Sequence, residues 1–260
     1  WLPPAHANAP APVSALLSGL VVTAAFYLMA RLWFQVFGPV VPAAAAHGIG
    51  ALACGAILWG GAQAFIQERL KLLVAYSTVS QLGYMFLVFP LSVPGGLAAE
   101  YAWQGGVYAA LAHGCAKAAA FLAAGALMHQ LGHDRIRDLR GAGWRMPVLV
   151  AAFGLAGVSL MGLPPSGGFV AKWMLLKAAL LGGQWWYAAT ILAGGLLAFA
   201  YVFRVLERAM TAPAASDPPV ATPWGLAVPA MALSLVAIAL GVASAWPLAL
   251  LGPLLPGGGP

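Results

Sequence analysis

Charged side chains are scarce in this sequence. Twelve Lys and Arg with six Asp and Glu make up 7% of the 260 residues, whereas a soluble domain has about 25%. Apolar residues make up 62%, and the mean hydropathy is +0.89. So few charges cannot cover a surface in water, and so many apolar residues exclude a disordered chain. The composition therefore predicts a polytopic membrane protein, in contact with lipid.

Cysteine and catalytic motifs are also scarce. Cys54 and Cys115 lie inside apolar runs and match no metal-ligand spacing or disulfide framework. The net charge of +6 is scattered along the chain, which argues against nucleic acid as a partner. The sequence also has no phosphate-binding loop, no Ser/His/Asp arrangement and no paired carboxylates in the apolar runs. We therefore expect no catalytic site, no metal and no cofactor in this chain.

Seven apolar stretches are long enough to cross a bilayer, which takes about 20 residues. They cover residues 12–37, 47–66, 70–91, 104–129, 147–180, 184–210 and 223–250. The fifth is too long for one crossing, and Pro164, Pro165, Gly167 and Gly168 interrupt it. Proline removes backbone donors and glycine relaxes the chain, so we expect two half-helices with a break at 162–168 near mid-membrane. The predicted fold class is an all-α membrane protein of about seven transmembrane helices.

The domain prediction follows from the same stretches. The chain begins at Trp1 rather than Met, and we interpret residues 1–11 as a leading segment from a missing upstream half. Residues 12–210 are expected to form one transmembrane bundle. An Ala/Pro-rich linker at 211–222 would join it to a terminal helix and tail at 223–260.

Basic residues follow the second and fourth apolar stretches and end the sixth. They are Arg69, Lys71, Arg135, Arg137, Arg140, Arg145, Arg204 and Arg208. The positive-inside rule places these connections in the cytoplasm. The N-terminal end of the chain would then be cytoplasmic and Pro260 outside. We interpret the cluster of Arg204, Glu207 and Arg208 as a surface face or partner contact.

A few ionisable residues lie inside the apolar stretches, where each costs about 2.5–3.5 kcal/mol on insertion scales. Lys117 lies in the middle of the fourth stretch. His113 is one turn earlier on the same helical face. Lys172 follows the break in the fifth. Buried lysine, histidine and hydroxyl groups are what a proton relay requires, so we predict that these three residues form one.

Further polar residues could line such a path. They are Lys71, Ser77, Thr78 and Tyr84 on the third stretch and Lys177 on the fifth. Three of the candidates also have a structural interpretation: Lys71 as a positive-inside anchor, Lys177 as a side chain that extends to the interface, and His113 as a hydrogen-bonded core histidine. Lys117 and Lys172 would be structural if they sat in helix-packing ion pairs. His6 is interpreted as a structural residue of the leading segment.

Four motifs, in order, resemble one family. They are WLPPAHANAPAPVSALLSG, RLKLLVAYSTVSQLGYMF, HGCAKAAAFLAAG and SLMGLPPSGGFVAKW. The sequence is similar to the antiporter-like subunits of respiratory complex I, a family that also includes the D-type subunit of Mrp-type cation/proton antiporters and the membrane arms of energy-converting hydrogenases. The resemblance runs from Trp1 to about Arg208 and covers the second half of such a protein.

The resemblance implies roles for individual residues. Lys117 would be the central lysine, His113 its neighbour and Lys172 the terminal relay residue. Thr23 stands where many relatives have a lysine. The chain would then lie in the inner (plasma) membrane of a prokaryote, as one of several membrane subunits of an NADH-quinone oxidoreductase, a hydrogenase or an Mrp-type antiporter complex.

The function expected from the residues and the resemblance is proton translocation through a buried Lys/His relay. Two alternatives stay open. The first is a sodium/proton antiporter subunit without redox coupling, in which sodium would also bind. The second is a purely structural membrane subunit, which would give Lys117 and Lys172 permanent acidic partners.

Overall fold

The computed structural model describes residues 1–38, 40–212 and 221–251. Within these residues the chain is almost entirely helical. The elements are α1 (Leu2–Asn8), α2 (Ala11–Leu16), η1 (Leu17–Val21), α3 (Val22–Leu32), η2 (Trp33–Phe37), α4 (Ala43–Ile66), α5 (Leu70–Phe86), α6 (Val88–Leu91), α7 (Gly96–Leu131), η3 (Ile136–Asp138), α8 (Ala142–Arg145), α9 (Pro147–Met161), α10 (Gly167–Leu181), α11 (Trp185–Met210), α12 (Trp224–Val242) and α13 (Ala245–Leu251).

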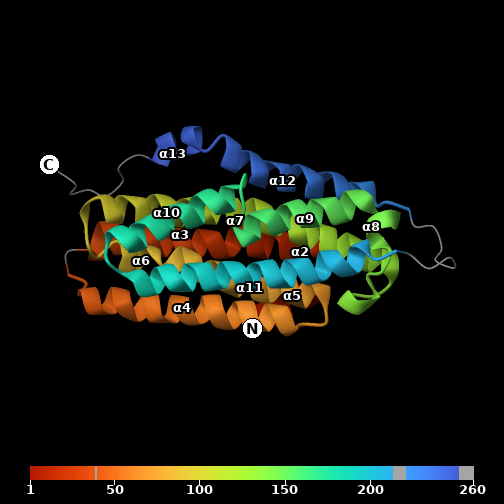
Figure 1. Ribbon diagram of the computed structural model, residues 1–260, viewed down its shortest axis with the longest axis horizontal. Coiled ribbons are helices and arrows are strands. Elements are labelled where there is room, and N and C mark those ends of the chain that lie inside the picture. Colours follow the sequence, from red (N-terminus) through yellow and green to blue (C-terminus); the bar gives the residue numbers. More distant parts are fainter. Residues whose placement is uncertain (39, 213–220, 252–260) are drawn as a thin grey trace.

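The long helices run side by side along the longest axis of the molecule (Figure 1). Six are long and apolar enough to cross a membrane: Ala11–Phe37, Ala43–Ile66, Leu70–Leu91, Gly96–Leu131, Trp185–Met210 and Trp224–Val242. The shorter helices α9 and α10 follow one another end to end and complete a seventh crossing. The predicted all-α polytopic fold with one broken helix is confirmed.

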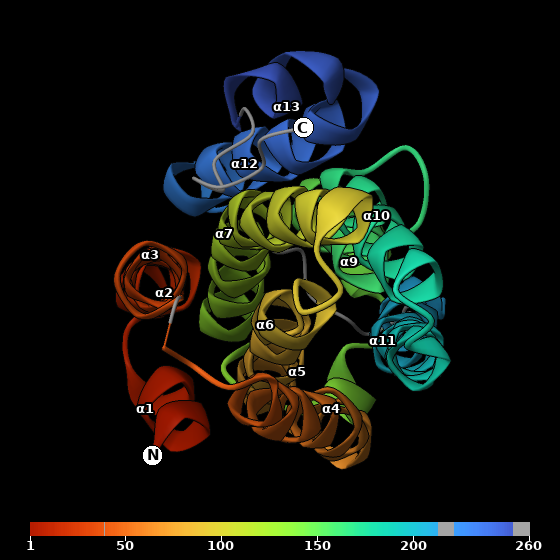
Figure 2. The ribbon, with the colours of Figure 1, turned by 90° about the vertical axis from the view of Figure 1, so that its left-hand side faces the viewer.

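Helix α7 is the centre of the bundle. Seen from the end, it lies between α12, the α9–α10 pair, α5 and the α2–α3 helix (Figure 2). Its 36 residues correspond to about 54 Å of helix, well over the roughly 30 Å of a bilayer core. It begins after Gly95 and ends at Gly132, both with positive φ. It is longer than the predicted 104–129 because these glycines, rather than the edges of the apolar run, set its ends.

The break in the fifth crossing lies between Met161 and Gly167. Gly162 ends α9 with a φ of 81°, and the Ser166 hydroxyl caps α10 by accepting from Phe169 N. Gly167 and Gly168, predicted to belong to the break, instead open α10. A Cβ on Gly168 would lie 1.9 Å from the Ser159 carbonyl oxygen, so only glycine permits this close contact of the two half-helices.

The last apolar stretch differs from its prediction. One helix was expected over 223–250, but α12 ends at Val242 and α13 starts at Ala245. Pro247 lacks the N–H that a continuous helix would bond to the Ala243 carbonyl, which explains the interruption. Most of the predicted linker at 211–222, and Pro260, lie outside the described residues.

The basic residues gather at one end of the bundle. There the connection after α7 pairs with the α4–α5 connection: Leu70 N donates to Asp134 O at 2.7 Å, and Ile136 N donates to Glu68 O at 2.8 Å. An ion pair between Arg69 and Asp134 at 2.6 Å joins the same two connections. We refer to this end, at the right of Figure 1, as the basic end.

Candidate functional site: a polar row between helices α5 and α7

Lys117 lies on the face of α7 that packs against α5. Its side chain is 0% exposed. The ammonium Nζ donates to the Val74 carbonyl at 2.8 Å and to the Ser77 hydroxyl. Among the described residues the recorded ion pairs involve only arginines, so no carboxylate balances this charge. A buried ammonium held only by neutral oxygens can give up its proton at lower cost than one in an ion pair.

His113 lies one turn before Lys117 and reaches toward the first spanning helix. We refer to the line of polar side chains that includes Lys117 and His113 as the polar row. Its Nε2 lies 3.3 Å from the carbonyl oxygen of Ser18. Ser18 belongs to the π-helical turn η1, and such a turn alters the usual carbonyl bonding of a helix. The Thr23 hydroxyl donates to the carbonyls of Gly19 and Leu20 in the same turn. The irregular turn thus directs its oxygens toward side chains.

Hydroxyl groups connect these two residues across the helices. The hydroxyls of Ser18 and Thr78 share a hydrogen bond of 2.9 Å. Thr78 also donates to the Val74 carbonyl, which accepts from Lys117 as well. The structure therefore brings Lys117, His113, Ser77 and Thr78 into one buried polar cluster.

Lys172 lies where the helix break exposes backbone oxygens. Its Nζ donates to the carbonyls of Leu160 at 2.8 Å and Met161 at 3.1 Å, at the end of α9. The last carbonyls of a helix lack partners and carry partial negative charge, so they stabilise an ammonium without a carboxylate. The same Nζ lies 4.3 Å from the centre of the Tyr84 ring, whose hydroxyl donates to Ile191 O.

A small cavity lies between His113 and Lys172. Its volume is about 20 Å³, and both side chains line it together with Gln81, Tyr84 and Ser159. This volume is enough for about one water molecule. The His113 Nδ1 atom has no hydrogen-bond partner among the described residues. A single water in the cavity would extend the row from His113 toward Lys172.

The row has an end near the basic residues, and sequence reasoning missed one residue there. Lys71, buried at the start of α5, donates its Nζ to the Ala9 carbonyl. His6 on α1 is 1% exposed, its ring lies 5.3 Å from that of Phe121, and both of its ring nitrogens lack partners among the described residues. His6 lies between prolines in the leading segment, and nothing in that pattern indicates that its side chain is buried.

The charge state of His6 follows from its surroundings. Helix α1 precedes the first spanning helix. Burial lowers the pKa of His6 to about 4, and the positive charges of Lys117 and Lys71 add to this effect. Near pH 7 the imidazole is therefore neutral, with one nitrogen that donates and one that accepts. A neutral imidazole can pass a proton between two lysines without holding a net charge itself.

Lys177, also considered for the path, lies elsewhere. Its Nζ is 5.0 Å from the ring centre of Tyr101 and 5.6 Å from that of Trp173. These contacts are cation–π interactions with residues that do not belong to the row. The structure thus brings Lys71, Ser77, Thr78 and Tyr84 to the row and leaves Lys177 apart.

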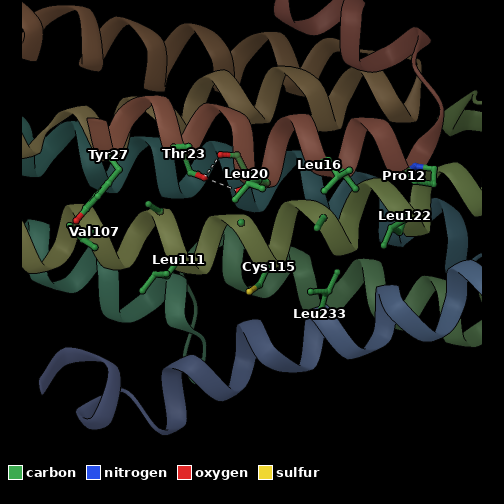
Figure 3. Close-up of a pocket in the computed structure, with 16 residues that line it drawn as sticks. Pro12, Leu16, Leu20, Thr23, Tyr27, Val107, Leu111, Cys115, Leu122 and Leu233 are labelled. Carbon is green, nitrogen blue, oxygen red and sulfur yellow. Dashed lines mark hydrogen bonds between the residues drawn. The ribbon is translucent and has the colours of Figure 1, made fainter. Parts of the chain in front are cut away.

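The opposite side of α7 is apolar. A cavity of about 650 Å³ lies between α7 and the α2–α3 helix, with Leu233 of α12 at its edge (Figure 3). Leu16, Leu20, Leu111 and Leu122 line it, and none of the lysines does. Thr23 is at its wall, but its hydroxyl is bonded to backbone. No lysine, histidine or carboxylate lines this cavity.

The match to known proteins agrees with the fold. The family model described as NADH:quinone oxidoreductase/Mrp antiporter, transmembrane, matches residues 1–198. The chain belongs to this family. A family member from Desulforudis audaxviator, NADH-quinone oxidoreductase subunit N, is 35% identical over 212 residues, which are 80% of this chain and 41% of the relative.

Solved structures of the antiporter family show the same fold. A chain of the Mrp complex from a Dietzia species superimposes with a TM-score of 0.86 at 27% identity, over 97% of this chain and 54% of that one. A chain of respiratory complex I from Thermus thermophilus gives 0.78 at 26% identity, over 99% and 55%. The chain thus spans about half the length of its relatives. It is an antiporter-like, multi-pass membrane protein of the type found in these complexes.

Proposed function

We propose that this chain translocates protons through the polar row, as part of a larger membrane complex. In this proposal a proton enters at the basic end, passes Lys71 and His6 to Lys117, and moves through His113 to Lys172. Lys172 then exchanges with the other side of the membrane. Ser77, Thr78, Ser18 and water in the small cavity bridge the gaps, since a bridging water is nearly as favourable as a direct bond.

One observation carries the proposal: Lys117 is fully buried with only neutral oxygens as partners. A purely structural lysine would gain from a carboxylate partner, and the described residues give it none. Leaving an ammonium in a membrane interior costs free energy, which is hard to explain without a role for its proton. Lys172 is only partly buried, but its partners are likewise uncharged: two carbonyls and an aromatic ring.

The orientation of the path and the energy that drives transport are the remaining parts of the proposal. We place the basic end in the cytoplasm by the positive-inside rule, and the membrane in a prokaryotic cell. The relatives named above belong to multi-subunit complexes, so we propose other membrane subunits as partners. Redox energy or an ion gradient would then act elsewhere and change the charge near each lysine in turn.

Sodium transport is the alternative within the family. A hard cation such as sodium prefers oxygen ligands, with carboxylates among the strongest. Among the described residues no carboxylate lies along the row, which favours protons over direct sodium binding. Replacing sodium by potassium in the assay tests this point, because a proton relay should keep its rate.

The central test replaces Lys117 by Met in the whole complex. We expect proton uptake by reconstituted vesicles to fall at least about tenfold, while assembly stays intact. Lys117→Arg should fail as well, because a guanidinium stays protonated throughout the working pH range. Lys177→Met is the matched control, since it removes a membrane lysine outside the row, and it should keep near-normal uptake.

Two results would decide against the relay. Normal uptake by an assembled Lys117→Met complex would favour the structural alternative. Equal loss in Lys117→Met and Lys177→Met would show that any lost lysine impairs the bundle. Assembly is measured on the same membranes by native electrophoresis, so that a folding defect is distinguished from a transport defect.

A further inference from the structure

We infer that the basic end holds a binding site for the phosphate head group of an anionic phospholipid. The site is a cavity of about 300 Å³ where α4 and α11 end. Its lining includes the side chains of Arg135, Arg137, Arg204 and Arg208, with Glu68 as the only acid. This inference does not depend on the proton path, because the cavity shares no residue with the polar row.

The cavity has a fixed frame rather than a set of free surface side chains. The pairing of the α4–α5 connection with the segment after α7 forms one wall, through the bond from Ile136 N to Glu68 O. Arg204 donates to the carbonyls of Phe65 and Gln67 at the end of α4. Its guanidinium also lies 5.7 Å from the centre of the Phe65 ring. These contacts orient Arg204 and close the cavity between the two helices.

The charge of the cavity selects an anion. Four arginines and one glutamate line the cavity. Asp134 is paired with Arg69 at 2.6 Å, and Asp138, 3.6 Å from Arg137, offsets part of the charge of that one arginine. A guanidinium group donates two parallel hydrogen bonds to the oxygens of a phosphate group. A basic pocket between membrane helices is a recognised type of site for anionic lipid head groups.

The position of the cavity favours a lipid over a soluble phosphate. It lies where two apolar spans reach their basic end, and exposed apolar side chains continue from it along the helices. Phe65 and Ile66 on α4 are 41% and 61% exposed, and Phe199 and Phe203 on α11 are 46% and 54% exposed. A head group in the cavity would leave its acyl chains against this apolar surface. A free phosphate would make no use of it.

The test measures binding of fluorescent phosphatidylglycerol to the purified complex in uncharged detergent. Arg137→Gln with Arg208→Gln should weaken binding roughly thirtyfold, because each basic residue near an anionic lipid surface contributes about a factor of five. Neither residue makes the backbone contacts that Arg204 makes. Arg140→Gln is the control, since Arg140 lies at the same end but outside the cavity, and its dissociation constant should change less than about twofold.

Competing ligands distinguish the source of the phosphate. Unlabelled phosphatidylglycerol should displace the probe, while phosphatidylcholine and soluble glycerol 3-phosphate should not at equal concentration. Displacement by glycerol 3-phosphate would make this a site for free phosphate, and displacement by phosphatidylcholine would remove the charge selectivity; either result overturns the inference. So does equal binding by the double variant and the Arg140→Gln control. If the double variant fails to assemble, Arg208→Gln alone should weaken binding about fivefold and Arg208→Lys should restore most of it.

Discussion

Helix α7 presents two faces with opposite chemistry. One face carries His113 and Lys117, which lie against backbone carbonyls of η1 and α5 and the Ser77 hydroxyl. The face toward the α2–α3 helix carries Cys115, Ala118 and Leu122 around an apolar cavity. Positions 117 and 118 are neighbours in the helix, but only the surroundings of position 117 offer hydrogen-bond acceptors to a lysine. The difference lies in the oxygens that the neighbouring helices supply, rather than in α7 itself.

Moving the lysine by one position should break this comparison most severely. Lys117→Ala with Ala118→Lys puts the ammonium against apolar side chains. We expect about 3 kcal/mol of destabilisation and loss of the assembled complex. The yield of complex in membranes and its thermal unfolding midpoint measure this, with Lys117→Met as the reference. Normal assembly of the shifted variant would show that the α5 face gives the lysine no particular support.

Removing the buried imidazole of His6 should affect transport more than stability. His6→Phe keeps the ring contact with Phe121 but removes both nitrogens. We expect proton uptake to fall about tenfold, which is less than the roughly 10²–10⁴-fold contribution of a general acid–base group in catalysis. His129→Phe is a control in the same assay, because His129 lies near the end of α7 outside the row. Unchanged uptake in His6→Phe would place the path from the basic end elsewhere.

The hydroxyl pair between η1 and α5 should have a smaller effect. Ser18→Ala removes the bond to Thr78 and leaves the Ser18 carbonyl next to His113. We expect about 1 kcal/mol of lost stability, as for one buried neutral hydrogen bond, and a severalfold slower proton uptake. Stopped-flow measurement with a pH dye resolves such a change. A loss as large as that of Lys117→Met would mean that Ser18 orders the whole turn.

Changes on the apolar face should have the smallest effect. Cys115→Met adds volume to a wall of the 650 Å³ cavity without introducing charge. Added volume costs about 1–3 kcal/mol where a core is already filled, but here it enters open space, so we expect stability within about 1 kcal/mol and proton uptake within a factor of two. A strong loss of uptake would indicate that the cavity takes part in transport, contrary to its lining.

The composition and apolar runs determined the number and type of crossings, because a bilayer requires about 20 apolar residues in each. The double proline, Pro164–Pro165, determined that the fifth crossing breaks, since proline removes helical donors. The four motifs determined the family and pointed to Lys117, His113 and Lys172. These features are local in the sequence, so periodicity and spacing expose them.

Only the tertiary structure decided which polar residues meet. The sequence offered Lys71, Lys172 and Lys177 for the path without showing which groups their side chains contact. Packing placed Lys172 on the free carbonyls of α9 and Lys177 on two aromatic rings instead. His6 was buried by α5 and α7, which are far from it in the chain. Contacts between distant segments depend on how whole helices pack, and the pattern within one helix carries little information about them.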